Sequence, residues 1–181
     1  MTKAVFRKPL AVAGGIAVLV VLFLLFRPDT LFTEVRVAES LEEAFATSTT
    51  EVTGAADETT GATTTTSPPE VQIVDIVSGS FIGIDHQAAG TATVYSQDGR
   101  YVLRFEDDTE IQNGPDLYVW VLPTDSYDGG IPGGYLDLGT LTGNVGGQNY
   151  QLPESFDPEV HRTVLIWCLR FSVPFAAAPL A

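Results

Sequence analysis

Cys168 is the only cysteine of the 181-residue chain, and its type makes it the residue best suited to redox or metal chemistry. It lies in the run TVLIWCLRFSV, where nearly every neighbour is apolar or aromatic. An accessible thiolate can pass through sulfenic acid, and it is also a ligand for soft and borderline metals. A buried cysteine instead packs like a small hydrophobic residue. The surroundings of Cys168 alone leave both interpretations open.

Two histidines are candidate second ligands, because imidazole suits copper, iron and zinc. His161 precedes Cys168 by a distance of about 23 Å along an extended strand at ~3.3 Å per residue, so the two cannot share a metal unless the chain bends sharply. His86 belongs to a different strand region and could reach Cys168 across the fold. With Asp116 these two residues would form an incomplete site. Asn113-Gly-Pro-Asp116 also has turn composition, in which such side chains cap local amides.

Arg170 follows Cys168 by two positions, so strand alternation places both side chains on one face. A guanidinium there would favour the thiolate, whereas the alternative is that Arg170 pairs with a surface carboxylate. Familiar enzyme signatures are missing from the sequence: it has no evident oxyanion-hole loop, no phosphate-binding glycine loop, no Cys-x-x-Cys and no His-Glu-x-x-His. We therefore expect an electron-transfer or binding module rather than a turnover enzyme.

The elements that must position these residues are short strands. From Val71 onward, apolar runs alternate with Gly, Pro, Asn and Asp, and Asp98-Gly99 predicts a hairpin turn between two β-rich runs. The run at 163–173 is apolar on both faces until Arg170, which predicts a central strand covered on both sides. About seven strands in roughly 110 residues predict an all-β, antiparallel sandwich or jelly roll over residues 71–181.

Before this domain lies an uncharged apolar run at residues 10–26, LAVAGGIAVLVVLFLLF, long enough for one transmembrane helix. Lys3, Arg7 and Lys8 precede it, so the positive-inside bias predicts a cytoplasmic N-terminus at residues 1–9 and an exported remainder. No Ala-x-Ala site follows the run, which argues against a cleaved signal peptide. The prediction is a single-pass protein of the plasma membrane with its C-terminal domain outside.

Residues 27–70 are predicted to be a juxtamembrane segment followed by a linker. The stretch AESLEEAFA can form a short amphipathic helix with Leu41, Ala44 and Phe45 on one side. From Thr47 to Glu70 about half of the residues are Ser or Thr and almost none is large and apolar, a composition typical of a disordered stalk.

Charge and cysteine content exclude several classes of partner and site. Nine basic residues face 23 acidic ones, for a formal net charge of −14. DNA, RNA and anionic lipid surfaces repel such a chain, so no nucleic-acid partner is expected. A single cysteine excludes an intramolecular disulfide and a multi-cysteine zinc cage.

Several stretches, in order, resemble the DM-thirteen domain family of bacterial membrane-anchored and animal extracellular proteins. They are GIDHQAAGTATVY, LRFEDD, NGPDLYVWV, GYLDLGTLTGNVGGQNYQLP and VLIWCLRFSVPFAAAPL. The resemblance covers about residues 75–181, and its most specific elements are the Asn-Gly-Pro-Asp-Leu and Trp-Cys-x-Arg-Phe stretches. One departure is EDDTEIQ at 106–112, where the family tends to carry an aromatic residue.

The resemblance implies an extracytoplasmic β-sandwich related to DOMON domains and serving in electron transfer. The family's cysteine falls on Cys168, the histidine of its His-x-x-x-Gly element on His86, and its aspartate after Gly-Pro on Asp116. It implies a redox partner protein, and a haem or a transition metal held by His86 and Cys168 is a possible cofactor. The alternative is a non-catalytic cell-surface binding or scaffolding module in which Cys168 is only structural.

Overall fold

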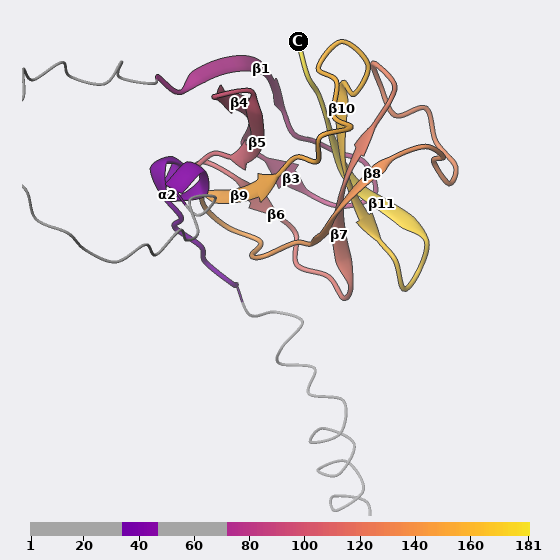
Figure 1. Cartoon of the computed structure of the whole chain (residues 1–181). Coiled ribbons are helices and arrows are strands. Elements are labelled where there is room, and N and C mark those ends of the chain that lie inside the picture. The colour runs from indigo at the N-terminus through magenta and orange to yellow at the C-terminus, as the bar shows by residue number, and fades with distance from the viewer. Residues whose placement is uncertain (1–33, 47–71) are drawn as a thin grey trace, which may run out of the picture. The chain divides into compact units, whose positions relative to one another are not determined.

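The computed structural model describes residues 34–46 and 72–181, and these residues are mostly β-structure (Figure 1). They contain one short helix, α2 (Leu41–Ala46). The strands are β1 (Val74–Ser80), β2 (Ile82–Gly83), β3 (Ala88–Ala89), β4 (Thr91–Gln97), β5 (Arg100–Phe105), β6 (Glu110–Ile111), β7 (Leu117–Leu122), β8 (Leu136–Thr140), β9 (Gln148–Gln151), β10 (Thr163–Cys168) and β11 (Val173–Pro179).

Two antiparallel sheets form the domain. One has four strands in the order β1-β4-β5-β9, the other has five in the order β2-β11-β10-β7-β8, and β3 pairs with β6 in a small third sheet. The main hydrophobic core is shared by both large sheets, with Val94 and Phe105 from the first and Val119 and Ile166 from the second. The predicted all-β antiparallel fold is confirmed, and its arrangement is that of a sandwich.

The predicted hairpin at Asp98-Gly99 is confirmed. Gln97 pairs with Arg100 across a two-residue turn, and both turn residues have positive φ, 54° and 75°. This is the type I′ geometry that matches the twist of the flanking strands and that favours Asp-Gly. The turn fixes the register of β4 and β5, and hence which of their side chains enter the core.

β10 is the central strand that the sequence predicts, since it pairs with β7 on one side and β11 on the other. All six of its residues are buried. Ile166 and Cys168 face the main core, while Leu165 and Trp167 face a second cluster on the other side of the sheet. In that second cluster Trp167 stacks on Trp120 at 5.3 Å between ring centroids, so both tryptophans are core residues.

β10 is shorter than the apolar run that contains it. The strand ends at Cys168, and residues 169–172 form a turn before β11. Leu169 and Phe171 are consequently 50% and 64% exposed, and Ser172 has a φ of +54°. The prediction that Arg170 shares a strand face with Cys168 is therefore wrong, because alternation of side chains stops where the strand stops.

Residues 34–46, which we call the strap, pack on the domain despite preceding the Ser/Thr-rich stretch. The backbone N–H groups of Val37 and Glu39 donate to the carbonyl oxygens of Val145 and Gly147, at 2.9 and 3.0 Å. The predicted amphipathic helix is confirmed as α2, and its Phe45 is only 4% exposed. Residues 34–181 thus form one compact unit.

Arg104 on β5 binds the strap through a hydrogen bond from its guanidinium. Its Nη1 donates to the Glu39 carbonyl at 2.9 Å and to Asn149 Oδ1 at 3.0 Å. Its Nε and Nη2 donate to the carboxylates of Glu106 and Asp107, so the buried guanidinium makes four hydrogen bonds. A buried charge with this many partners stabilises one docked arrangement of the strap.

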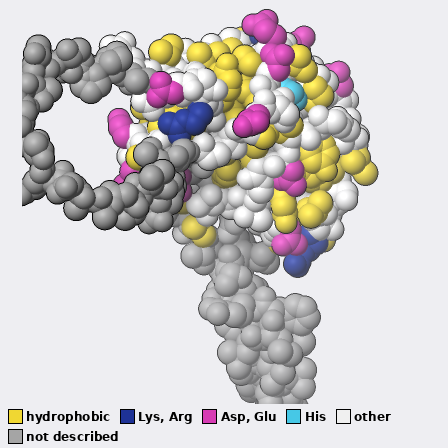
Figure 2. Space-filling view, viewed as in Figure 1, with side chains coloured by type: hydrophobic (Ala, Val, Ile, Leu, Met, Phe, Trp, Pro, Cys, Tyr) yellow, Lys and Arg dark blue, Asp and Glu magenta, His cyan; other side chains and the backbone are white. Residues whose placement is uncertain are grey.

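The predicted transmembrane segment at residues 10–26 and the Ser/Thr-rich linker at 47–70 lie outside the described residues. No helix within residues 34–46 and 72–181 has the length and apolar character that crossing a bilayer requires. Figure 2 shows acidic side chains spread over the described surface and basic ones at only a few places, in keeping with the net charge of −14.

Candidate functional site

The two most specific sequence motifs meet in space. The loop Asn113–Asp116 lies between β6 and β7, and the turn after Cys168 lies between β10 and β11. Cys168 is paired with Leu117 in the register of β10 and β7, which brings the loop directly beside the end of β10. We call the loop 113–116 together with Cys168 and Arg170 the thiol site.

Cys168 is fully buried, with a relative exposure of 0%, but its sulfur has a polar partner. Sγ lies 3.1 Å from the carbonyl oxygen of Pro115. In this hydrogen bond the thiol donates and the carbonyl oxygen accepts. The sulfur therefore lies at the polar end of the core, beneath a loop, and not in the middle of the hydrocarbon.

Asp116 joins the loop to the turn after β10. Its φ of +52° is in the left-handed region, which Asp tolerates better than most residues. In this conformation its carbonyl oxygen accepts the N–H of Leu169 at 3.0 Å, and its carboxylate pairs with Arg170 Nε at 2.7 Å. The side chains of Asp116 and Arg170 are 46% and 59% exposed, so this ion pair is of the surface type and contributes at most ~1 kcal/mol.

The open alternatives for Arg170 are thereby decided in favour of the carboxylate. Its guanidinium pairs with Asp116 and not with the sulfur of Cys168.

Gly114 has a packing role that explains its place in the motif. A Cβ at this position would lie 2.5 Å from Cζ of Phe175 on β11, closer than atoms can approach. The same ring stacks on His86, with 3.6 Å between centroids and an interplanar angle of 24°. His86 therefore reaches the thiol site through Phe175. Within the described part of the chain, His86 stacks on Phe175 and the sulfur of Cys168 bonds to Pro115, and the two side chains share no hydrogen bond.

His161 lies at the other end of β10, before its first residue, Thr163. Its Nδ1 interacts with the backbone of Asp157. The separation that the sequence predicts between His161 and Cys168 is consistent with this placement, because a whole strand lies between them.

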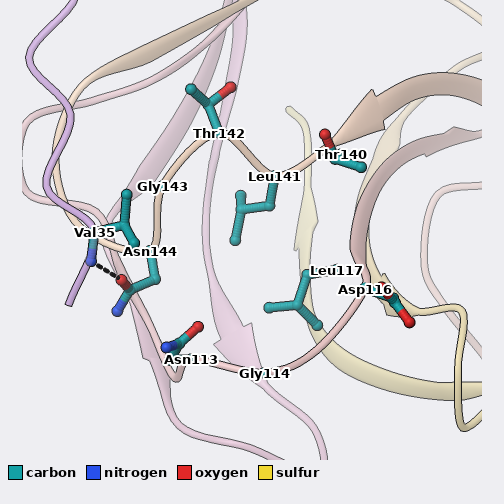
Figure 3. Close-up of a pocket in the computed structure, with 10 residues that line it drawn as sticks. All are labelled: Val35, Asn113, Gly114, Asp116, Leu117, Thr140, Leu141, Thr142, Gly143 and Asn144. Carbon is teal, nitrogen blue, oxygen red and sulfur yellow. Dashed lines mark hydrogen bonds between the residues drawn. The ribbon is translucent and has the colours of Figure 1, made fainter. Parts of the chain in front are cut away.

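A pocket of about 230 Å³ adjoins the thiol site (Figure 3). It is lined by Asn113, Gly114, Asp116 and Leu117 on one side, by residues 140–144 on another, and by Val35 of the strap. Cys168 does not line it, but Leu117, its partner in the sheet register, does.

The 140–144 wall and the strap are held by hydrogen bonds. Asn144 Oδ1 accepts the N–H of Val35 at 2.6 Å, as Figure 3 shows. Tyr150 accepts the N–H of Thr142 at 3.0 Å and donates to Gln148 Oε1 at 2.7 Å. Burial raises the pKa of Tyr150 to about 12, because the phenolate would lose its hydration there.

Sequence reasoning singled out the thiol, the loop and Arg170, and the structure brings these together. It missed Val35 and the 140–144 wall. Glycines and threonines in LTGNVGG mark a loop, but nothing in that composition shows which surface it faces. Val35 carries no sequence signal at all, since the strap is separated from the domain by the Ser/Thr-rich stretch.

The donor set does not fit a metal held by three or more side chains. Within the described parts of the chain, no three His, Cys, Asp or Glu residues come together in that way. The sulfur of Cys168 is engaged with a carbonyl, and one face of the His86 ring is covered by Phe175. We derive no step through a metal or haem, and the two-residue ligand pair stays a prediction.

Comparison with known proteins gives one positive result. No curated protein sequence and no solved structure matches the chain. The family model described as Electron transfer DM13 matches residues 80–180, more than half of the chain. These residues contain both motifs of the thiol site. The chain therefore belongs to the DM13 electron-transfer family.

Proposed function

We propose that the protein is a membrane-anchored, extracytoplasmic redox module whose centre is the thiol of Cys168. The observation that carries the proposal is the meeting of the two signature motifs at that one sulfur, through the bond from Sγ to Pro115. The family match supports an electron-transfer role for the domain as a whole. The anchor and the location rest on the apolar run at 10–26 and on the basic residues before it.

The closed site must open for chemistry, because the sulfur is fully buried. Three contacts hold the loop to the end of β10 and the turn after it: the thiol to Pro115, the Leu169 N–H to Asp116, and Arg170 to Asp116. All three lie at the rim of the sandwich. Their loss would uncover the sulfur while the central sheet stays paired, which is the kind of local opening that rims of domains undergo.

Once uncovered, Cys168 can react by thiol–disulfide exchange. The thiol gives its proton to water, the thiolate attacks one sulfur of a disulfide, the S–S bond breaks, and the other sulfur leaves as a thiolate. The product is a mixed disulfide between Cys168 and the partner. Since Cys168 is the only cysteine, a second thiol must come from the partner for the electrons to be passed on. A redox partner protein is therefore part of the proposal.

The second candidate is a non-catalytic surface-binding module with a structural cysteine. The observation that favours it is the complete burial of Cys168, whose sulfur fills space in the main core. The adjoining pocket would then serve binding without any role for the thiol.

Exposure of the full chain to glutathione disulfide separates the two functions. The redox proposal predicts a mixed disulfide on the native protein, detected by mass, that is absent in Cys168→Ala and is formed faster in Asp116→Ala, where the loop is less tightly held. If only denatured protein forms the mixed disulfide, the structural role is correct. Resistance of the full chain to alkaline extraction from membranes tests the anchor separately.

A further inference from the structure

The turn Leu169–Ser172, which we call the tip, exposes two large apolar side chains beside the thiol site. Leu169 is 50% exposed and Phe171 is 64% exposed, and Arg170 lies between them. Because Arg170 is paired with Asp116, the tip carries no uncompensated charge. An apolar and locally neutral surface of this kind is suited to an apolar partner.

The strap limits how far the tip can be from the apolar run at 10–26. From Phe26 to Glu34 there are eight Cα–Cα steps, which span at most roughly 26–29 Å. A compact unit the size of residues 34–181 measures about 35–40 Å across. The chain before the strap therefore keeps Glu34, the first residue of the strap, within roughly 26–29 Å of the end of residues 10–26. If residues 10–26 cross a bilayer, the end of the domain where the strap begins is the end tied to that bilayer.

The strap begins at the same end of the domain as the thiol site. Val35 lines the pocket together with Asp116, and Asp116 contacts Arg170 of the tip. Only the pocket separates the start of the strap from the tip. Figure 1 shows the start of residues 34–46, the loop before β7 and the β10–β11 turn at the lower end of the domain.

We propose that the tip contacts the bilayer surface, with Leu169 and Phe171 in the interfacial region, so that the thiol site faces the membrane. This inference rests on the proposed anchor. Burying one large apolar side chain changes an equilibrium constant by about tenfold or more. The anchor holds the tip at an effective concentration of about millimolar, so a contact too weak for a free domain suffices within one molecule.

The orientation defines the class of reactant. A reactant held in the bilayer or on its surface would have the shortest path to Cys168, because the tip beside the thiol site would lie against that surface. The redox partner is then a membrane protein or a lipid-borne molecule rather than a freely diffusing extracellular protein.

Fluorescence of a label at the tip tests the contact. In a Cys168→Ala background, which leaves the chain without cysteine, Phe171→Cys is labelled with nitrobenzoxadiazole in the full chain. The protein is reconstituted into phosphatidylcholine vesicles that contain a lipid-attached quencher. The matched control is Ile131→Cys, which replaces a 76% exposed apolar residue in the loop after β7, at the opposite end of that strand from the thiol site. If the alanine background does not fold, Cys168→Ser takes its place, so that the chain still has no other thiol to take the label.

We expect the label at position 171 to be quenched several-fold more strongly than the label at 131. Equal quenching at the two positions, or no quenching at 171 in chain that stays with the vesicles after alkaline washing, overturns the contact and leaves the anchor intact. Loss of the chain from the vesicles during that wash overturns the anchor, and this inference with it. Labels at 171 that stay in water until a membrane protein is added would identify a protein as the occupant and overturn the bilayer contact.

Discussion

Replacing Phe45 by alanine tests whether the strap is an integral part of the domain. The side chain lies in a cluster with Ala44 of the strap and the fully buried Val102 of β5. Phe→Ala in a core costs ~3–5 kcal/mol. This cluster lies at the edge of the domain, and the loss is limited to the free energy with which the strap docks. We therefore expect the free energy of unfolding of residues 34–181 to fall by about 2–4 kcal/mol, through loss of apolar burial and of docking.

Urea unfolding followed by tryptophan fluorescence measures this change. The control is Ile131→Ala, in which a 76% exposed side chain is removed, with an expected change within ~0.5 kcal/mol. Gly143→Ala should undock the strap in a second way, because the new Cβ would clash with Cγ2 of Val37 and displace the strap. The two destabilisations should not add, because each removes the same docking. A Phe45→Ala protein as stable as its parent would refute the docked strap.

Three further outcomes follow from the geometry. Raising the pH from 10 to 12 should lower the free energy of unfolding of residues 34–181 by ~1.4 kcal/mol per pH unit. The reason is that the phenol of Tyr150, with its pKa of about 12, stays neutral in the folded state, whereas the unfolded chain's phenol ionises near pH 10. Below pH 10 this loss is absent, and in Tyr150→Phe the fall measured by urea titration should be smaller. Gly114→Ala should cost about 1–3 kcal/mol by overpacking against Phe175, whereas Gly133→Ala, with open space around the new methyl group, should cost little; equal thermal shifts would contradict this packing role. Arg170→Ala should change stability by less than ~1 kcal/mol in low salt and by less still in high salt, and a larger loss would mean that the ion pair with Asp116 is not of the surface type.

The central strand β10 and the hairpin of β4 and β5 could be predicted because both have local signals. The run around Trp167 is apolar at successive positions, which only a strand covered on both faces tolerates. Asp98-Gly99 specifies its turn through the backbone conformation of those two residues. In each case the sequence pattern and the structure depend on the same short stretch of chain.

The end of β10 could not be predicted, because the apolar pattern continues through the turn. Leu169 and Phe171 look like further strand residues, and the turn contains neither glycine nor proline. The strand ends where the backbone becomes left-handed, at Ser172 in the turn itself and at Asp116, which lies opposite Leu169 and is far from it in sequence. For that reason the position assigned to Arg170 was wrong, although its carboxylate pairing was among the alternatives.

The docking of the strap had even less local signal. Its hydrogen bonds run largely through backbone groups, which every residue has, so the sequence of Val37 and Glu39 does not reveal them. Only α2 was predictable, from the spacing of Leu41, Ala44 and Phe45.

The most direct test of the central claim is the rate at which a water-soluble alkylating reagent modifies Cys168 in native protein, measured at increasing urea below the unfolding transition. A thiol site that opens locally predicts modification much faster than global unfolding allows, with little dependence on urea, and faster still in Asp116→Ala. Modification that follows the global unfolding equilibrium at every urea concentration would show that the sulfur is reached only when the sandwich unfolds, and would contradict a redox centre at Cys168.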